Sequence, residues 1–357
     1  MHADSHLGIL VCGAGVFGRN HLRVYRALER DGGAPVRLAA IVEPDRVRAA
    51  AAAAEWGIPV FSSVGECLAA RARGEIACAA ASVCTPTSAH AEVAEALLDA
   101  GFDLLVEKPI AATVAEATRL IELAAQHGRI LQAGHLERFN PAITATEPIL
   151  NHPMFFEAHR LSVFSPRSLD VDVVLDLMVH DLDIVLSLVR SPIRSLHAVG
   201  LPILSPKVDI ANVRIEFESG CVANFTASRV STERVRKLRF FQPHQYVSID
   251  YARQDLLLID VSGASGAPSL SATAVADRVG SGHPLAGFPG LHIDKPPVQQ
   301  GEPLRLEIES FLESVRTRSA PRVSGEDGRA ALAVALEITA AMAAHAKRAG
   351  LERFARR

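Results

Sequence analysis

The chain has 357 residues, of which 49% are hydrophobic and 22% are charged, and its formal net charge at pH 7 is -3. This length exceeds one ordinary domain and predicts two, and the composition is typical of a globular protein with a large core. The charge balance gives no signal for binding a polyanion, which argues against a nucleic-acid partner. No stretch approaches the roughly 18 uninterrupted apolar residues of a membrane span, and the N-terminus does not resemble a signal peptide.

The cysteines indicate a reducing compartment. The chain has an odd number of cysteines, and no two of them form a C-x-x-C pair. They are Cys12, Cys67, Cys78, Cys84 and Cys221. This pattern predicts free thiols that are mostly buried, a cytoplasmic location and no metal site.

A glycine-rich loop follows the first apolar run. Residues 7–12 read as a short strand, Gly13-Ala-Gly15-Val16-Phe17-Gly18 comes directly after it, and a helix is predicted from Arg19. In this strand–turn–helix context, Gly13 makes the tight turn, Gly15 lets the backbone approach a pyrophosphate, and Gly18 allows close packing. The helix N-terminus attracts the phosphates. The loop therefore predicts a dinucleotide site formed by Gly13, Gly15, Val16, Phe17 and Gly18.

An acidic residue ends the second predicted strand, which covers residues 36–42 and is followed by Glu43. This is where a ribose hydroxyl is held in such folds, so Glu43 favours NAD over NADP. Arg46 and Arg48 follow closely and could accept the extra phosphate of NADP, so the choice of cofactor stays open.

Strand and helix signals then alternate. Helices are predicted at 47–56, 64–71, 91–100 and 113–127, with strands near residue 60 and at 76–84, 104–106 and 129–133. Repeated βα units of this length predict a parallel, doubly wound Rossmann sheet, which we assign to a domain of residues 1–128. Since ligands bind at the carboxyl ends of such strands, we expect further cofactor contacts from residues at those ends, namely Arg48, Thr85, Pro86, His90, Glu107 and Lys108.

Lys108 is the candidate catalytic residue of this half. It ends a buried strand and precedes Pro109. Beside a nicotinamide, a partly desolvated lysine can donate a hydrogen bond to a substrate hydroxyl and help to move a proton. The alternative is a surface lysine in a turn.

The second half, residues 129–357, has strands grouped around one long helix. Strands are predicted at 155–164, 193–203, 210–218, 221–230, 238–242, 246–251 and 256–261, with a two-residue turn at Ser219-Gly220. This pattern predicts an α+β domain with a mostly antiparallel open sheet. Residues 262–290 are rich in Gly, Ala, Ser and Pro and predict a long loop. Two helices, 304–318 and 326–348, close the chain.

The long helix, residues 171–189, is apolar on most sides. Its polar residues are spaced by four, four, three and four, which places them along one line of the helix: Asp172, Asp176, His180, Asp183 and Ser187. Asp176 and His180 are neighbours at i and i+4, and a carboxylate beside an imidazole is a tuned acid–base pair. The alternative is a purely structural polar contact.

The order of these motifs resembles the glucose–fructose oxidoreductase / inositol dehydrogenase / MocA family over nearly the whole chain. The motifs are GAGVFG at 13–18, Glu43, CTPTSAH at 84–90, EKP at 107–109, QAGHLERFNP at 132–141 and Asp176-x-x-x-His180. The resemblance implies an NAD(P)-dependent oxidoreductase. In it, His180 is the general acid/base, Asp176 orients His180, and Lys108 binds the reacting oxygen. Met178 departs from the family pattern, because many members have glycine at this place.

Segments such as GHLERFNPA and EAHRLS look like the subgroup that oxidises UDP-N-acetylglucosamine at C3 for lipid A synthesis. Polar groups on segments flanking the cleft could bind the diphosphate and the sugar hydroxyls of such a substrate: Arg138, Asn140, His159, Arg160 and Arg229, with His180 at the reacting hydroxyl. The alternative for each of these groups is a fold-stabilising or solvated role. The alternatives are an inositol- or aldose-type polyol dehydrogenase, or a non-catalytic dinucleotide-binding regulator. By analogy with the family, the open sheet predicts a homodimer or homotetramer.

Overall fold

The structure is a computed structural model that describes residues 6–32, 35–164, 171–260 and 291–351. The chain divides into two compact units. The first unit comprises residues 1–139 and 301–336, and the second comprises residues 140–300 and 337–357. This division differs from the predicted boundary at residue 128. Residues 131–134 pair with the strand before them in the sheet of the first unit, and a segment near the C-terminus returns to that unit.

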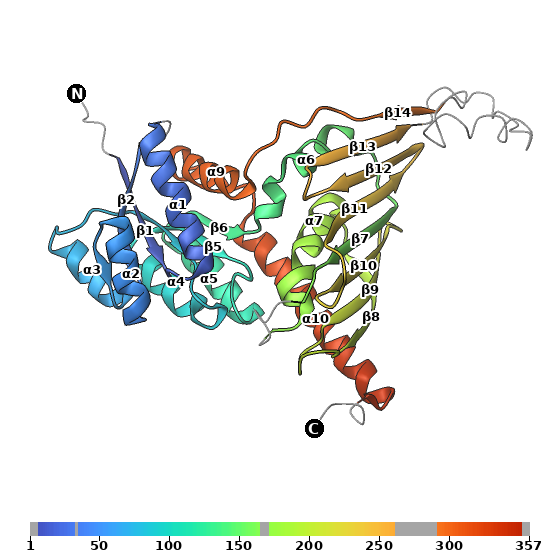
Figure 1. Cartoon of the computed structure of the whole chain (residues 1–357), viewed down its shortest axis with the longest axis horizontal. Coiled ribbons are helices and arrows are strands. Elements are labelled where there is room, and N and C mark those ends of the chain that lie inside the picture. The colour runs from blue at the N-terminus through green and yellow to red at the C-terminus, as the bar shows by residue number, and fades with distance from the viewer. Residues whose placement is uncertain (1–5, 33–34, 165–170, 261–290, 352–357) are drawn as a thin grey trace, which may run out of the picture. The chain divides into compact units, whose positions relative to one another are not determined.

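The first unit contains a six-stranded sheet in the order β3-β2-β1-β4-β5-β6, and every pair of neighbouring strands is parallel. The strands are β1 (Leu7–Cys12), β2 (Val36–Val42), β3 (Val60–Phe61), β4 (Ala80–Val83), β5 (Asp103–Glu107) and β6 (Leu131–Gly134). Helices flank the sheet (Figure 1): α1 (Val16–Asp31), α2 (Arg46–Trp56), α3 (Val64–Ala72), α4 (His90–Asp99) and α5 (Val114–Gln126). The predicted doubly wound Rossmann sheet is confirmed, although β4 begins later than residue 76.

The core of the first unit explains why residues 301–336 belong to it. Helix α9 (Pro303–Thr317) lies beside α1, as Figure 1 shows. Its apolar residues Leu304, Ile308 and Phe311 join one buried cluster with Ile9 and Tyr25. These side chains are almost entirely removed from water, so the α9 contact contributes to the stability of the sheet unit itself.

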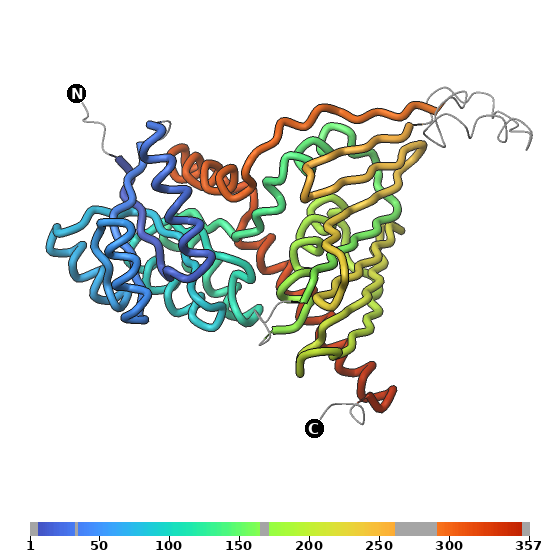
Figure 2. The backbone as a smooth tube through the Cα atoms, in the orientation of Figure 1, coloured from blue at the N-terminus to red at the C-terminus, as the bar shows by residue number. Residues whose placement is uncertain are grey.

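The second unit contains an eight-stranded sheet in the order β14-β13-β12-β11-β7-β10-β9-β8. Figure 2 shows most of these strands side by side in green to gold: β7 (Phe155–Leu161), β8 (Ile193–Leu201), β9 (Ile210–Phe217), β10 (Val222–Ser228), β11 (Val235–Gln242), β12 (Gln245–Asp250), β13 (Asp255–Asp260) and β14 (His292–Asp294). All pairs are antiparallel except β7 with β10. The predicted mostly antiparallel sheet is confirmed, and β14 is an addition. The predicted loop at 262–290 lies outside the described residues.

The long helix of the second unit is not α-helical throughout. It opens with one π-helical segment, η4 (Val174–Met178), and continues as α7 (Val179–Val189). Single π-helical turns occur frequently at functional sites, where they change the direction in which side chains point. The short helix α6 (Pro141–Thr144) and the 3-10 helix η3 (Glu147–Ile149) precede β7.

Helix α10 (Gly325–Arg348) contributes its first half to the first unit and its second half to the second. It is the one helix among the described residues with the length and apolar composition of a membrane span. Part of its apolar surface packs in the protein interior, where Ala331, Leu332, Ala335, Ile338 and Met342 are buried. A core helix passes the same test of length and composition.

Candidate active site

The glycine loop after β1 has the shape of a phosphate cradle. Gly13 has φ +95°, and a Cβ there would lie 2.7 Å from the carbonyl oxygen of Cys84. A Cβ on Gly18 would lie 1.8 Å from the carbonyl oxygen of Gly13, so both positions require glycine. A Cβ on Gly15, in contrast, would meet no atom within 4 Å. The loop therefore leaves open space at Gly15 where a pyrophosphate fits.

Helix α1 begins at this loop without a side-chain cap and without an acidic residue in its first turn. Its first N–H groups and its positive dipole end therefore suit an anion. Val16 and Phe17 are 62% and 43% exposed, so they are accessible at the mouth of the loop. These features fit a bound dinucleotide.

Glu43 lies directly after β2 and is 2% exposed. Its Oε2 accepts a hydrogen bond from the Ala14 backbone N–H at 2.8 Å, and its Oε1 accepts from Arg48 Nη2 at 2.9 Å and from the Asp45 N–H at 3.0 Å. Burial raises the pKa of Glu43, but the bond from Arg48 and the two backbone bonds outweigh it, so the net pKa is lowered. Glu43 is therefore an ionised group that ties the tip of β2 to the glycine loop.

The loops after β4 and β5 are joined by His90. This ring is buried, and its nitrogens lie 2.9 Å from the carbonyl oxygen of Pro109 and 2.8 Å from that of Thr85. Burial lowers the pKa of His90, and the two carbonyl contacts oppose that shift. A neutral ring donates a hydrogen bond to only one of the two carbonyl oxygens. His90 therefore braces the two loops that carry Thr85, Pro86 and Lys108. Its direct contact with a cofactor, like that of Pro86, stays a prediction.

A buried network next to Lys108 was not predicted. His21 Nε2 lies 2.9 Å from Glu107 Oε1, His21 Nδ1 lies 3.1 Å from Ser82 Oγ, and Tyr25 Oη lies 2.8 Å from the same Ser82 oxygen. Glu107 Oε2 accepts from the backbone N–H of Lys108 at 3.2 Å. The signal for His21 was a polar residue on the apolar face of α1, three positions after Gly18, among Leu22, Val24 and Tyr25.

On the long helix of the second unit, Asp176 and His180 are both partly exposed, whereas Met178 between them is 1% exposed. Met178 thus fills the core and lies away from the accessible side of the helix. The bulk that replaces glycine in the family pattern is therefore accommodated in the interior.

The other polar residues of the predicted stripe have structural contacts. Asp172 caps the start of the helix, because its Oδ1 accepts from the N–H groups of Val174 and Leu175, and its Oδ2 accepts from Thr339. Ser187 Oγ donates to the Ile184 carbonyl, and Asp183 is 2% exposed. At the centre of the predicted polar line, the accessible groups are therefore Asp176 and His180.

The predicted substrate-binding residues also have internal contacts. Arg160 is 4% exposed and forms a two-pronged ion pair with Asp181, with its Nε 2.7 Å from Oδ2 and its Nη2 2.9 Å from Oδ1. Asn140 is 2% exposed, caps α6 and donates to the Tyr251 carbonyl. Arg138, in the 3-10 helix η2 (Leu136–Phe139) of the first unit, is partly exposed. Substrate binding by Arg138, Asn140 and Arg160 stays a prediction, and the contacts of Arg160 and Asn140 assign both residues a bracing role.

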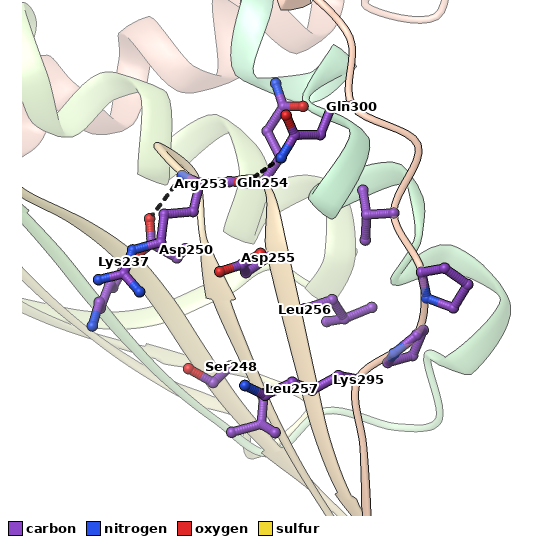
Figure 3. Close-up of a pocket in the computed structure, with 13 residues that line it drawn as sticks. Lys237, Ser248, Asp250, Arg253, Gln254, Asp255, Leu256, Leu257, Lys295 and Gln300 are labelled. Carbon is purple, nitrogen blue, oxygen red and sulfur yellow. Dashed lines mark hydrogen bonds and ion pairs between the residues drawn. The ribbon is translucent and has the colours of Figure 1, made fainter.

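A surface cavity of the second unit lies between the end of the sheet and residues 295–300 (Figure 3). It measures about 340 Å³ and is lined by charged side chains that include Lys237, Asp250, Arg253 and Lys295. Its rim is held by Gln300, whose Nε2 donates to the Arg253 carbonyl at 3.1 Å. Neither Asp176 nor His180 lines this cavity, so we assign it no part in the chemistry.

The free cysteines agree with the sequence prediction, since Cys12, Cys67, Cys78 and Cys221 are buried and only Cys84 is partly accessible. Among the described residues, no group of three or more His, Cys, Asp or Glu side chains is arranged to hold a metal ion.

The first unit has a parallel sheet with an open glycine loop after β1, an ionised glutamate after β2 and a lysine after β5. These features define a class of proteins, the oxidoreductases that bind a nicotinamide dinucleotide. Comparison with known proteins agrees. Residues 7–135 match the family described as "Oxidoreductase family, NAD-binding Rossmann fold", and residues 153–242 match the GFO/IDH/MocA C-terminal domain.

Individual relatives extend this match to almost the whole chain. UDP-N-acetylglucosamine 3-dehydrogenase from Acidithiobacillus ferrooxidans is 34% identical over 96% of this chain and 99% of its own. A solved structure of that enzyme has a TM-score of 0.81 and covers 95% of this chain and 98% of its own. Inositol 2-dehydrogenase from Leifsonia xyli is 33% identical over 55% of this chain and 57% of its own. The chain belongs to the GFO/IDH/MocA family of oxidoreductases and has its NAD-binding Rossmann domain.

Proposed function

We propose that this protein is an NAD-dependent dehydrogenase that oxidises a sugar nucleotide, UDP-N-acetylglucosamine, at the C3 hydroxyl. The carrying observation is the full-length similarity to a UDP-N-acetylglucosamine 3-dehydrogenase, together with Lys108, Asp176 and His180 in this chain. The inositol dehydrogenases match only about half of the chain, which favours the sugar nucleotide over an inositol.

The proposed chemistry assigns one role to each candidate residue. His180 removes the proton from the substrate hydroxyl, and Asp176 on the same helix orients the imidazole and stabilises its charged form. Lys108 donates a hydrogen bond to the oxygen as it becomes a carbonyl. NAD, when bound, supplies the acceptor for the hydride. Gly13, Gly15, Gly18 and Glu43 would hold it, through the open cradle at Gly15 and the ionised carboxylate at the end of β2.

The test is a substrate panel. The purified protein is mixed with NAD or NADP and with UDP-sugars, inositols and aldoses, and the absorbance of reduced nicotinamide is followed. We expect turnover with UDP-N-acetylglucosamine and NAD. Turnover of an inositol without turnover of any UDP-sugar would instead establish the polyol dehydrogenase. Cofactor binding without turnover of any substrate would favour the non-catalytic regulator.

We further propose that the protein is a homodimer or homotetramer built through the outer face of the eight-stranded sheet. Strand β11 alternates buried residues, such as Leu238 and Phe240, with partly or fully exposed ones, such as Arg239 and Phe241. On the exposed side, the ring of Phe241 lies 5.6 Å from that of Phe155 and 5.0 Å from that of Tyr246. An aromatic cluster on a broad open sheet suits burial against a second copy. Light scattering should show an oligomer that Phe241→Glu weakens, and a wild-type monomer would reject the proposal.

We also place the enzyme in the cytoplasm, where its product would supply the 3-amino sugar of lipid A. The free thiols of all five cysteines support a reducing compartment. Fractionation of the source cells would test the location, and the lipid A species made without this gene would test the pathway.

A further inference from the structure

The buried network beside Lys108 has one consistent hydrogen-bond direction. Tyr25 is 0% exposed and its hydroxyl contacts Ser82, so the Tyr25 O–H must donate to Ser82 Oγ. The Ser82 O–H is then directed to His21 Nδ1, and His21 Nε2 carries the proton that it donates to Glu107. Every polar hydrogen of the chain Tyr25–Ser82–His21–Glu107 is thereby satisfied, and the chain ends on a carboxylate.

Glu107 is ionised in this network. Burial raises its pKa, but the contact with His21, the charge of Lys108 and the Lys108 N–H outweigh burial and lower the pKa. A charged carboxylate that is 5% exposed needs such partners to remain in the interior.

The carboxylate has little freedom to move. A Cβ on Gly134 of the neighbouring strand would lie 2.9 Å from Glu107 Cα and 3.2 Å from Glu107 Cδ, so β6 approaches Glu107 as closely as only glycine allows. Glu107 Oε2 in turn accepts from the backbone N–H of Lys108, and His90 contacts the carbonyl oxygen of Pro109 on the other side. Two buried histidines thus hold the residues on either side of Lys108.

We propose that His21 is a positioning residue, which fixes the backbone of Lys108 through the carboxylate of Glu107 so that the lysine side chain meets the substrate in one geometry. Small displacements of a catalytic group lower the rate strongly, and an oriented hydrogen-bond chain reduces them. This inference rests on the proposed function for its kinetic readout, but it concerns contacts inside the first unit alone.

The first experiment compares His21→Leu with His21→Gln. Leucine removes the donor to Glu107 at similar volume, and we expect kcat to fall about 10- to 100-fold with KM for the sugar nucleotide changed less than about threefold. Glutamine can place an amide N–H near the position of Nε2, so His21→Gln should recover most of the loss. Ser82→Ala removes the hydrogen bond to Nδ1, and its kcat should lie between that of His21→Leu and that of the wild type.

The matched control is His127→Gln. His127 is also paired with a carboxylate in the first unit, because its Nε2 lies 3.2 Å from Asp99 Oδ1, but this pair is on the surface. Its loss should leave kcat unchanged. A folded His21→Leu protein whose kcat lies within about twofold of the wild type would overturn the proposal.

A second experiment asks whether His21 acts through Lys108. In the Lys108→Ala background, His21→Leu should lower kcat by less than about a further twofold, because the side chain that His21 positions is absent. Losses that multiply in the double variant would show that His21 acts elsewhere, or only on stability, and would also overturn the proposal.

A third readout needs no substrate. The sequence contains five lysines, Lys108, Lys207, Lys237, Lys295 and Lys347, of which only Lys108 belongs to the first unit. Mass spectrometry after brief acetylation of the amines measures the reactivity of each. His21→Leu should raise the labelling rate of Lys108 relative to the other four, since its side chain is no longer held, and an unchanged rate would contradict the inference. If the wild-type enzyme has no activity on any sugar nucleotide, the proposed function is wrong, but the inference about His21 is not affected. The labelling of Lys108 then still tests the role of His21.

Discussion

The two units position their candidate residues by different means. In the first, a glycine loop and strand ends set the backbone positions of Glu43, Thr85 and Lys108, and the contacts of Arg48 with Glu43 and of His21 with Glu107 add to them. In the second, buried ion pairs brace the elements around Asp176 and His180. Arg160 pairs with Asp181 of the same long helix, and Arg229 pairs with Asp209 at 2.9 Å.

This difference has a physical reason. A parallel sheet brings its strand ends to one edge by topology alone, so that the binding loops need few charged partners. A helix lying on an antiparallel sheet can shift or rotate, and a charge pair with fixed directions limits that freedom. The residue Arg229, for example, also donates to the carbonyl oxygens of Val171 and Val208 and so ties down the start of the long helix.

The strongest test of the role of buried ion pairs in the second unit is to break the Arg160–Asp181 pair. Arg160→Met should lower the free energy of unfolding by about 3–5 kcal/mol, because Asp181 is left as a buried charge without its main partner. The exposed pair of Arg214 with Glu216, 3.5 Å apart, is the control, and Arg214→Met should cost less than about 1 kcal/mol. Urea unfolding measures both losses, and equal losses would show that the buried pair does not brace the second unit more than an exposed pair does.

Substitution of the candidate catalytic residues should change the reaction rate and not the free energy of unfolding. We expect His180→Ala and Lys108→Ala each to reduce kcat by about 100-fold or more, the usual scale for acid–base groups. His197→Ala, on the exposed side of β8, is the control for His180. Near-normal turnover in either variant would take that residue out of the mechanism.

Asp209 should make the second unit sensitive to acid. Burial raises its pKa, but hydrogen bonds from the Ser205 hydroxyl and from the N–H groups of Ser205, Ile203 and Leu204 outweigh burial and lower the pKa to about 2. Because the folded pKa lies below the ordinary value of 3.8, the stabilisation is present above about pH 4 and is lost as the pH falls towards 2.

The shift corresponds to about 2 kcal/mol at neutral pH. Unfolding of the wild type and of Asp209→Asn should therefore differ by about that amount at pH 7 and converge near pH 2. A difference that does not depend on pH would show that the carboxylate charge is not what stabilises this turn.

The smallest expected effect concerns the choice of cofactor. Glu43→Ala removes the carboxylate partner of Arg48 and the negative charge at the ribose position, so the preference for NAD over NADP should fall about tenfold. Glu75→Ala, which removes an exposed carboxylate paired with Arg73 in the same unit, should change this preference little. The ratio of kcat/KM with the two cofactors is the measurement, and an unchanged ratio would exclude Glu43 from cofactor selection.

The sequence predicted the first unit well because its signals are local. A strand, a glycine turn and a helix follow one another directly at residues 7–31. The same alternation of strands and helices places Glu43 and Lys108 at the ends of β2 and β5. His21 was missed because its role depends on Ser82 and Glu107, which are distant along the chain. Such a partner can be inferred only as an unexplained polar residue on an apolar helix face.

The second unit was harder for the same reason. A regular 3.6-residue period predicts one polar line through Asp176 and His180, and both residues are partly exposed in the structure. The π-helical segment and the buried Asp183 do not follow from that period. The return of residues 301–336 to the first unit also has no local signal, because it depends on which core accepts Leu304, Ile308 and Phe311.

This return has a consequence for how the protein is made. A ribosome completes the parallel strands of the first unit by residue 134, yet α9, which covers part of its core, is synthesised only after the whole second sheet. Until then, the surface around Ile9, Leu22 and Tyr25 stays open to water or to a chaperone. A fragment that ends at residue 139 should accordingly aggregate, and a transplantable Rossmann unit would need residues 301–336 joined back by a linker.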